Sequence, residues 1–129
     1  MDLIQLKRFL VAAEAGNLRR AAALLHVSQP ALTQSIKGLE AMLGVELFER
    51  SARGVALTPF GKALVPRARM MLNERERIAR EVRGEVLAAL GVKVDDVRLW
   101  PVGAIPRTTS GKIQRRACAR RFDEEGARP

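Results

Sequence analysis

The chain has 129 residues, which is enough for one modest domain and an appendage but not for two full domains. Its 23 basic and 14 acidic side chains give a formal net charge of +9, which favours a polyanionic partner, either nucleic acid or an acidic membrane surface. A single cysteine, Cys118, excludes an internal disulfide and a cysteine-based metal cluster. No apolar run is long enough to span a bilayer and the N-terminus lacks the layout of a secretion signal, so we expect a cytoplasmic protein without a membrane partner.

The positive charge is spread along the whole chain. Residues 1–58 carry a net charge of +2, residues 59–90 carry +3 and residues 91–129 carry +4. The charge therefore supports a nucleic-acid partner only weakly, and the pattern of residue types must identify the partner.

The first two predicted helices are short and amphipathic. The first begins after Asp2, a good N-cap, and ends at Gly16, and Asn17 starts the second. Their apolar residues recur at helical spacing and are expected to face the core. They are Leu3, Leu6, Phe9, Leu10 and Ala13 in the first helix, and Leu18, Ala21, Ala22 and Leu25 in the second.

A third helix is predicted from the N-cap Ser28 to Gly44, after a turn at His26 and Val27. Pro30 falls in the first turn, where its missing N–H has no intrahelical partner to lose. Gly38, inside this helix, should cost roughly 1 kcal/mol relative to alanine. The apolar positions expected to face the core are Leu32, Ile36, Leu39 and Leu43. The opposite face holds Gln29, Pro30, Thr33, Gln34 and Lys37.

Two short strands, 47–50 and 55–58, are predicted next, with a polar turn between them. A long helix then starts at Pro59 and reaches about residue 90, with a bend at Pro66. From residue 91 the pattern indicates a strand over 92–100, a loop, a short basic helix over 113–122 and a disordered end. The expected fold is mainly α: a winged helix-turn-helix over 1–58, a linker or dimerisation helix over 59–90, and a small α/β or partly disordered basic tail over 91–129.

The order helix, turn, helix and hairpin is typical of a winged helix-turn-helix, which places a polar helix face in the DNA major groove. Gln34 can address an adenine bidentately, and Thr33 can offer its hydroxyl or its methyl group to a base. Ser28 and the amides beside it suit a phosphate oxygen. The expected DNA-contacting residues are Arg20, Ser28, Gln29, Pro30, Thr33, Gln34, Lys37, Arg50 and Arg53.

The N-terminal part of the chain resembles the DNA-binding domain of LysR-type transcriptional regulators. The resemblance covers about residues 1–80 and includes the segments Ser28-Gln29-Pro30 and Leu47-Phe48-Glu49-Arg50, together with Thr58 and Gly61. It implies double-stranded DNA as the partner, a basic position at Arg20 that contacts the DNA backbone, and a homodimer built through the 59–90 helix. The family's effector-binding domain does not follow in this sequence, so we expect a truncated regulator without a small-molecule inducer site.

Residues 82–122 resemble a different family, the C-terminal subdomain of adenylate-forming enzymes, especially fatty-acyl-AMP ligases. The resemblance rests on the run from Pro106 to Arg116, with Thr108-Thr109-Ser110-Gly111-Lys112 at its centre. It implies that Lys112 stabilises negative charge during adenylation. The large nucleotide-binding domain that completes such a site is missing from this sequence, so we interpret the tail as a fused remnant and expect neither enzyme activity nor a cofactor.

Three alternatives remain open from the sequence. The tail can be an adenylation fragment that acts with a separate large domain, or the whole chain can be a non-functional fusion product. The basic stretch from Arg107 to Arg121 can also be a solvated surface that adds sequence-independent DNA affinity. Glu40 and Glu49 are expected to pair with nearby arginines, and Trp100 and Cys118 are expected to pack or to lie at the surface.

Overall fold

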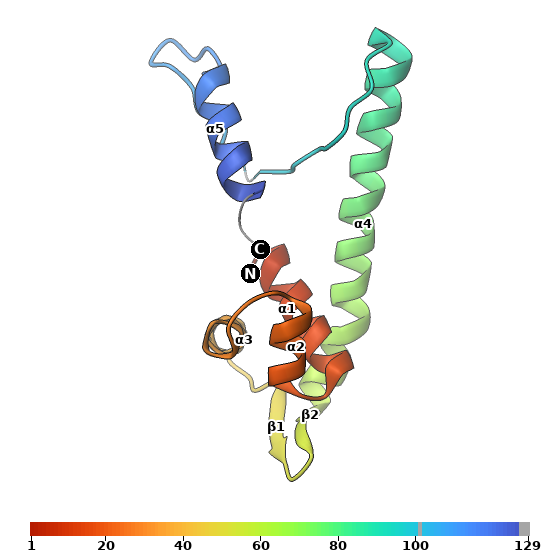
Figure 1. Cartoon of the computed structure of the whole chain (residues 1–129), viewed down its shortest axis with the longest axis vertical. Coiled ribbons are helices and arrows are strands. Elements are labelled where there is room, and N and C mark those ends of the chain that lie inside the picture. The colour runs from red at the N-terminus through yellow and green to blue at the C-terminus, as the bar shows by residue number, and fades with distance from the viewer. Residues whose placement is uncertain (101, 127–129) are drawn as a thin grey trace. The chain divides into compact units, whose positions relative to one another are not determined.

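The structure is a computed structural model that describes residues 1–100 and 102–126, apart from the side chain of Arg50. Helices dominate the described part, which also contains one two-stranded sheet (Figure 1). The mainly helical fold class predicted from the sequence is therefore confirmed. The chain forms two compact units, one ending at Glu74 and the other beginning at Arg75.

Three helices open the first unit: α1 (Leu3–Ala15), α2 (Leu18–Leu24) and α3 (Gln29–Leu43). Asp2 caps α1, since its carboxylate accepts a hydrogen bond from the Gln5 amide at 2.6 Å. The Gln5 side chain accepts one in return from the Asp2 amide at 3.1 Å, which completes a capping box. All three helices lie where the sequence predicts them.

Polar side chains also cap the next two helices. The Asn17 side-chain oxygen accepts hydrogen bonds from the amides of Arg19 and Arg20 at 2.9 and 3.1 Å. The Ser28 hydroxyl oxygen accepts one from the Ala31 amide at 3.3 Å. Each cap satisfies amides that have no partner inside the helix, so the short α2 and α3 both begin at defined residues.

The core of the first unit consists of two adjoining clusters of apolar side chains. One contains Leu6, Phe9, Leu10, Leu39, Leu47 and Ala68, and the other contains Ala12, Ala21, Ala22, Leu32 and Ile36. Two expectations about the core are wrong. Ala12 is fully buried whereas Ala13 is only half-buried, and Leu43 is 39% exposed because α3 ends there and the chain turns away at Gly44.

The strands β1 (Phe48–Ser51) and β2 (Gly54–Leu57) form an antiparallel hairpin, the wing, which projects from the helices (Figure 1). Phe48 pairs with Leu57 and Ser51 pairs with Gly54, so the turn between the strands contains only two residues. Both strands differ from the predicted ranges by one residue. The phenyl ring of Phe48 lies 5.5 Å from that of Phe9, which anchors the base of the wing in the core.

The long helix α4 (Pro59–Leu90) has the bounds that the sequence predicts and continues through Pro66. Thr58 caps it, because its hydroxyl accepts a hydrogen bond from the Gly61 amide at 3.1 Å. The same hydroxyl donates to the carbonyl of Glu46 at 2.7 Å. The start of α4 is thereby tied to the chain just before the wing.

The second unit contains the C-terminal part of α4, an extended segment and the helix α5 (Arg115–Gly126). The strand predicted over 92–100 is wrong, because that segment pairs with no other strand in the described residues. The predicted helix start at Ile113 is also wrong, since Ile113 forms an isolated antiparallel bridge with Arg107. Residues 123–126, predicted to be disordered, form the last turn of α5, and residues 127–129 lie outside the described part.

The extended segment packs against α5 through two cation–π contacts. The guanidinium carbon of Arg98 lies 4.0 Å from the ring centroid of Phe122, and that of Arg121 lies 4.6 Å from the ring of Trp100. The Trp100 indole also donates a hydrogen bond to Glu125 at 2.7 Å. Trp100 is therefore a packing residue of this unit.

Candidate nucleic-acid interface

One face of α3 is polar and open to solvent. Gln29, Pro30, Gln34 and Lys37 are exposed and Thr33 is half-buried, as the helical spacing of these residues predicts. These five residues are called the α3 polar face below. They offer amide, hydroxyl and ammonium groups, which match the donor and acceptor groups of base edges and the charge of phosphates.

The opposite face of α3 fixes the orientation of the polar face. Leu32 and Leu39 are 0% exposed and Ile36 is 5% exposed, and each packs in one of the two core clusters. Rotating α3 about its axis would bring these side chains into water, at a cost of about 1.5–3 kcal/mol for each. The polar face therefore cannot turn inward without breaking the core.

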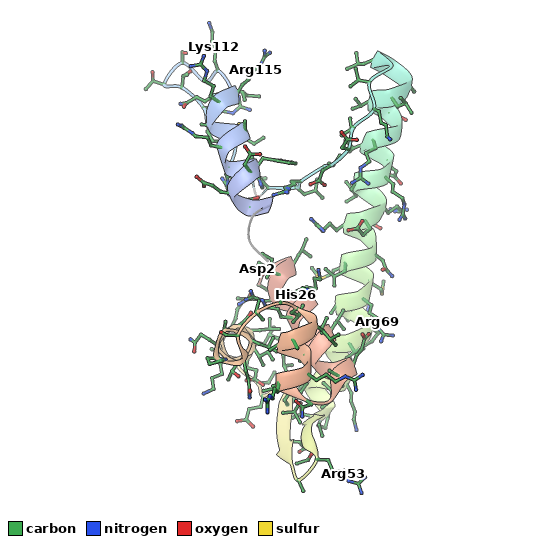
Figure 2. The ribbon with its side chains drawn as sticks, viewed as in Figure 1. Asp2, His26, Arg53, Arg69, Lys112 and Arg115 are labelled. Atoms are coloured by element: carbon green, nitrogen blue, oxygen red, sulfur yellow. The ribbon has the colours of Figure 1, made fainter. Side chains whose placement is uncertain are left out.

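The turn between α2 and α3 depends on an unusual backbone conformation. His26 has φ of +54°, in the left-handed region that residues other than glycine rarely adopt. Its amide donates to the carbonyl of Ala23 at 3.2 Å, and the next amide, that of Val27, donates to Ala22 at 3.0 Å. The His26 side chain is exposed (Figure 2).

Glu40 connects α3 to the wing. Its carboxylate accepts hydrogen bonds from the backbone amides of Leu47 and Phe48 at 2.8 and 3.3 Å. The prediction that Glu40 pairs with an arginine is wrong, because the two amides where the chain enters β1 bind the carboxylate instead. A carboxylate suits them well, since charged acceptors form stronger hydrogen bonds than neutral ones.

A second link joins the wing to the corner between α1 and α2, and the sequence reasoning missed it. The Val55 amide donates to the carbonyl of Gly16 at 3.1 Å. The neighbouring residue, Gly54, has φ of +130°, and a Cβ atom there would lie 2.4 Å from the same carbonyl oxygen. Only glycine allows this approach, so the glycine at the end of the turn was the available signal.

The start of α4 is held against the rest of the first unit at two places. The Thr58 amide donates to the carbonyl of Leu47 at 3.0 Å. Farther along, the Arg69 guanidinium forms an ion pair with Glu14 of α1 at 2.9 Å. Both side chains of this pair are more than half exposed, so we assign it little stability and treat it as a positional link.

The remaining predicted contact residues lie on α2, at the start of α3 and in the wing. Arg20 is exposed on α2, and Ser28 is exposed at the first turn of α3. Arg53 is exposed in the two-residue turn at the tip of the wing (Figure 2). The side chain of Arg50 is outside the described residues, so its predicted role stays a prediction.

The described residues hold neither a metal-binding cluster nor a membrane-spanning helix. No group of three or more His, Cys, Asp or Glu side chains there is arranged to hold a metal ion. Within the same residues, no helix combines the length and the apolar character that crossing a membrane requires. Cys118 is a free, half-buried thiol.

The helical cluster, the tight turn before an exposed polar helix face and the two-stranded wing together define a winged helix-turn-helix domain. Residues 3–62 match the family profile described as "Bacterial regulatory helix-turn-helix protein, lysR family". The N-terminal part of the chain therefore belongs to the LysR-type helix-turn-helix family, as its resemblance predicts.

Named relatives and solved structures agree with this assignment. The HTH-type transcriptional regulator TfdS of Cupriavidus pinatubonensis (strain JMP 134 / LMG 1197) is 51% identical over 92 residues, covering 67% of this chain and 30% of TfdS. The CbnR DNA-binding domain in its crystal structure with DNA is 46% identical with a TM-score of 0.61, covering 68% of this chain and 99% of that one. The BenM DNA-binding domain bound to benA site 1 DNA is 33% identical with a TM-score of 0.58, and the match covers 60% of this chain and 91% of that one.

The matched region is thus a helix-turn-helix domain of the LysR family. The chain spans about 30% of the length of relatives such as TfdS.

Proposed function

We propose that the chain binds double-stranded DNA in a sequence-specific manner through its winged helix-turn-helix, as a regulator of transcription. The observation that carries the proposal is the α3 polar face, which is exposed while the opposite side of the same helix is locked in the core. The two similar domains solved with DNA support the same role. In this proposal α3 enters the major groove and the wing lies beside it along the duplex.

Each contact residue has a role that its position supports. Gln34 and Thr33 read base edges, and Gln29 and Pro30 do so at the helix end that enters the groove first. The Ser28 hydroxyl oxygen already accepts from the Ala31 amide, so its proton is free to donate to a phosphate. The cations that bind phosphates or the minor groove are Arg20, Lys37, Arg50 and Arg53.

We further propose that α4 pairs with α4 of a second copy. Phe60, Met71, Ile78 and Val82 follow one another at intervals of 11, 7 and 4 residues, which places them along one side of the helix. Three of them are 39–57% exposed, and Ile78 is half-buried. A dimer would cover this α4 stripe and present two recognition helices to two half-sites of a near-palindrome. Such a regulator would work in the bacterial cytoplasm, on the nucleoid.

A titration of the whole chain against DNA flanking its own gene tests the proposal. Gln34→Ala should reduce the discrimination between specific and random DNA by about 1–3 kcal/mol, because a base contact is lost. Arg53→Ala should weaken binding to all sequences and lower the salt slope by about 1. Lys7→Ala, which removes one exposed charge from α1 outside the proposed surface, is the matched control. Parent-like discrimination by Gln34→Ala and a parent-like salt slope for Arg53→Ala would show that the assigned face is wrong.

A second proposal concerns the C-terminal tail. We propose that residues 82–122 are a remnant related to the C-terminal subdomain of adenylate-forming enzymes and that they have no adenylation activity. A pyrophosphate-exchange assay, with Lys112→Ala as the control, tests this. Exchange that the substitution abolishes would favour an adenylation fragment acting with a separate domain. A chain that neither melts cooperatively nor discriminates between DNA sequences would favour the non-functional fusion.

A further inference from the structure

We propose that the second unit carries its own DNA contact, a surface that binds backbone phosphates irrespective of sequence. The surface consists of the hairpin 106–114 and the first two turns of α5. Its cations are Arg107, Lys112, Arg115, Arg116 and Arg120, and we call them the basic end. The inference rests on the proposed DNA-binding function and extends it to a part of the chain outside the winged helix-turn-helix.

The cations of the basic end are exposed. Within the described residues, Lys112, Arg115, Arg116 and Arg120 form no ion pair. Arg107 donates a hydrogen bond at 2.8 Å to a backbone carbonyl, that of Gly111, so its charge is not neutralised by a carboxylate. Five positive charges therefore remain available to an anionic ligand.

The hairpin holds its cations on an ordered backbone. The Thr108 amide donates to the carbonyl of Lys112 at 2.8 Å, and the Lys112 amide donates to the Thr108 hydroxyl at 3.1 Å. The Gln114 amide donates to the carbonyl of Pro106 at 2.9 Å, directly before α5 begins. Lys112 and Arg115 consequently lie at the same end of α5 (Figure 2). An ordered loop loses less backbone entropy on binding than a disordered basic tail does.

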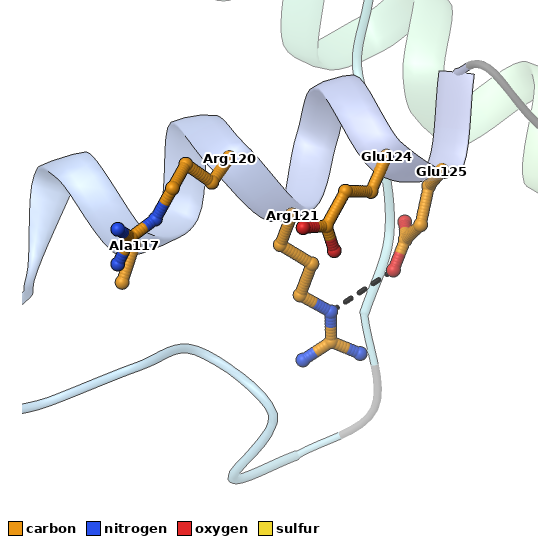
Figure 3. Close-up of a pocket in the computed structure, with 5 residues that line it drawn as sticks. All are labelled: Ala117, Arg120, Arg121, Glu124 and Glu125. Atoms are coloured by element: carbon orange, nitrogen blue, oxygen red, sulfur yellow. Dashed lines mark hydrogen bonds and ion pairs between the residues drawn. The ribbon is translucent and has the colours of Figure 1, made fainter.

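The two sides of α5 differ in their contacts, since one packs within the unit and the other faces solvent. The inward side contains half-buried residues at helical spacing, namely Ala117, Cys118, Arg121, Phe122 and Glu125. A surface hollow of about 410 Å³ lies along α5, where the guanidinium of Arg121 pairs with Glu125 at 2.9 Å (Figure 3). The hydrogen bond from Trp100, followed by that from Arg121, holds the pKa of Glu125 below its ordinary value. Arg121 is thus occupied inside the unit, whereas Arg120 is free of such a pair.

The order of charges along α5 opposes what helix stability favours. Arg115 and Arg116 lie at the N-terminus and Asp123, Glu124 and Glu125 lie in the last turn, although the helix dipole prefers the reverse arrangement. The stability of the helix therefore does not explain this charge order. A bound phosphate does, because it would be attracted by the cations and by the positive helix end together.

Duplex DNA fits this surface better than a membrane does. The outward side of α5 presents Arg116, Ala119, Arg120, Asp123 and Glu124. Ile113 of the hairpin is an exposed large apolar side chain, but one such residue does not form the apolar face by which surface helices enter lipid. The winged helix-turn-helix on the same chain would also keep DNA at a high local concentration around the basic end. The partner we assign is therefore the phosphate backbone of duplex DNA.

The test compares two double variants of the full chain, each of which removes two positive charges. Arg115→Gln/Arg116→Gln changes the basic end, and Arg77→Gln/Arg80→Gln changes two exposed positions of α4 away from the α4 stripe. Binding of each variant to random-sequence DNA and to DNA flanking the gene is titrated at several salt concentrations. The first variant should lower the slope of log K against log salt by about 2 for both DNAs, and affinity at 0.1 M salt by about 10- to 100-fold. The control should keep the parent slope.

Each other outcome has a defined meaning. If the parent binds DNA and both variants keep its slope of log K against log salt, or lower that slope by the same amount, the basic end is not a DNA contact. The proposed function then still stands. If the parent binds no DNA, the proposed function fails as well. Loss of binding to phosphatidylserine vesicles with an unchanged DNA slope would assign the surface to membranes and overturn the inference. Lys112→Gln, at an exposed hairpin position, provides a second variant should the α5 changes alter Trp100 fluorescence.

Discussion

Replacing Gly61 by alanine should destabilise the first unit, whereas the same change at Gly84 should not. Both glycines lie in α4, where alanine is the better helix former by about 1 kcal/mol. A Cβ atom at Gly61 would lie 2.2 Å from the carbonyl oxygen of Leu47 and 2.7 Å from Cδ2 of Leu57. At Gly84 it would meet nothing within 4 Å. The two substitutions therefore share a helix propensity gain, but only Gly61 lacks the space for a Cβ atom.

The magnitude follows from the contact at Leu47. A carbon and a carbonyl oxygen approach to about 3.3 Å at the closest, so the backbone at Gly61 must retreat by about 1 Å. The overpacking costs about 1–3 kcal/mol. The same carbonyl accepts the Thr58 amide at 3.0 Å, and weakening that bond adds about 1 kcal/mol. After subtracting the helix propensity gain, Gly61→Ala should therefore cost about 1–3 kcal/mol, and Gly84→Ala should add up to about 1 kcal/mol of stability.

Urea unfolding provides the measurement. Circular dichroism at 222 nm follows all helices, and fluorescence of Trp100, the single tryptophan, follows the second unit. With a slope of about 1 kcal/mol per molar urea, Gly61→Ala should lower the midpoint of the first unit by about 1–3 M. A midpoint equal to that of the parent would refute the proposed close packing of α4 against Leu47.

Three further predictions concern other parts of the chain. Glu40→Ala should destabilise the first unit by about 2 kcal/mol in the same urea assay, because two amides lose a charged acceptor; an unchanged midpoint would contradict this link to the wing. Met71→Lys should convert the proposed dimer to a monomer in sedimentation equilibrium without changing the helix content, and a persistent dimer would exclude the α4 stripe as the interface. Glu125 has a pKa lowered from 4.5, so its contribution is complete above about pH 4.5 and is lost as the pH falls through the lowered value. Trp100 fluorescence should therefore stay constant from pH 7 to 5 and change only in more acidic solution, whereas Glu125→Gln should remove that transition.

The sequence predicts most of the first unit because local signals there agree with one another. Helical spacing, caps at Asp2, Asn17 and Ser28, and proline in the first turn of α3 all specify the same boundaries, which the structure confirms. The α3 polar face is likewise exposed where the spacing of Gln34 predicts. Its DNA contacts stay a prediction.

The links between elements could not be predicted, because they join residues far apart in the sequence. Glu40 accepts hydrogen bonds from Leu47 and Phe48 because the chain passes close to α3 again where β1 begins. Local spacing does not show this return. Gly38 is a similar case. A Cβ atom there would lie 3.3 Å from the side-chain nitrogen of Gln5 in α1, so Gly38 lies close to another helix, which the spacing within α3 does not show.

The second unit was predicted less well, for a different physical reason. The alternation over 92–100 is compatible with a strand, but a strand requires a partner, and this segment packs on α5 through side chains instead. The contacts of Arg98 with Phe122 and of Arg121 with Trp100 are tertiary, so the basic composition of this region gave no sign of them.

The hydrogen bond from Val55 to the Gly16 carbonyl has a consequence for retargeting the protein. It couples the hairpin to the corner between α1 and α2, so the hairpin cannot move independently of these helices. In the proposed complex, side chains on α3 could be exchanged to alter operator preference without changing this hydrogen bond. Lengthening or shortening the hairpin, in contrast, would shift its register at Gly54 and detach it from the corner, and the distance between the proposed groove and flank contacts would no longer be fixed.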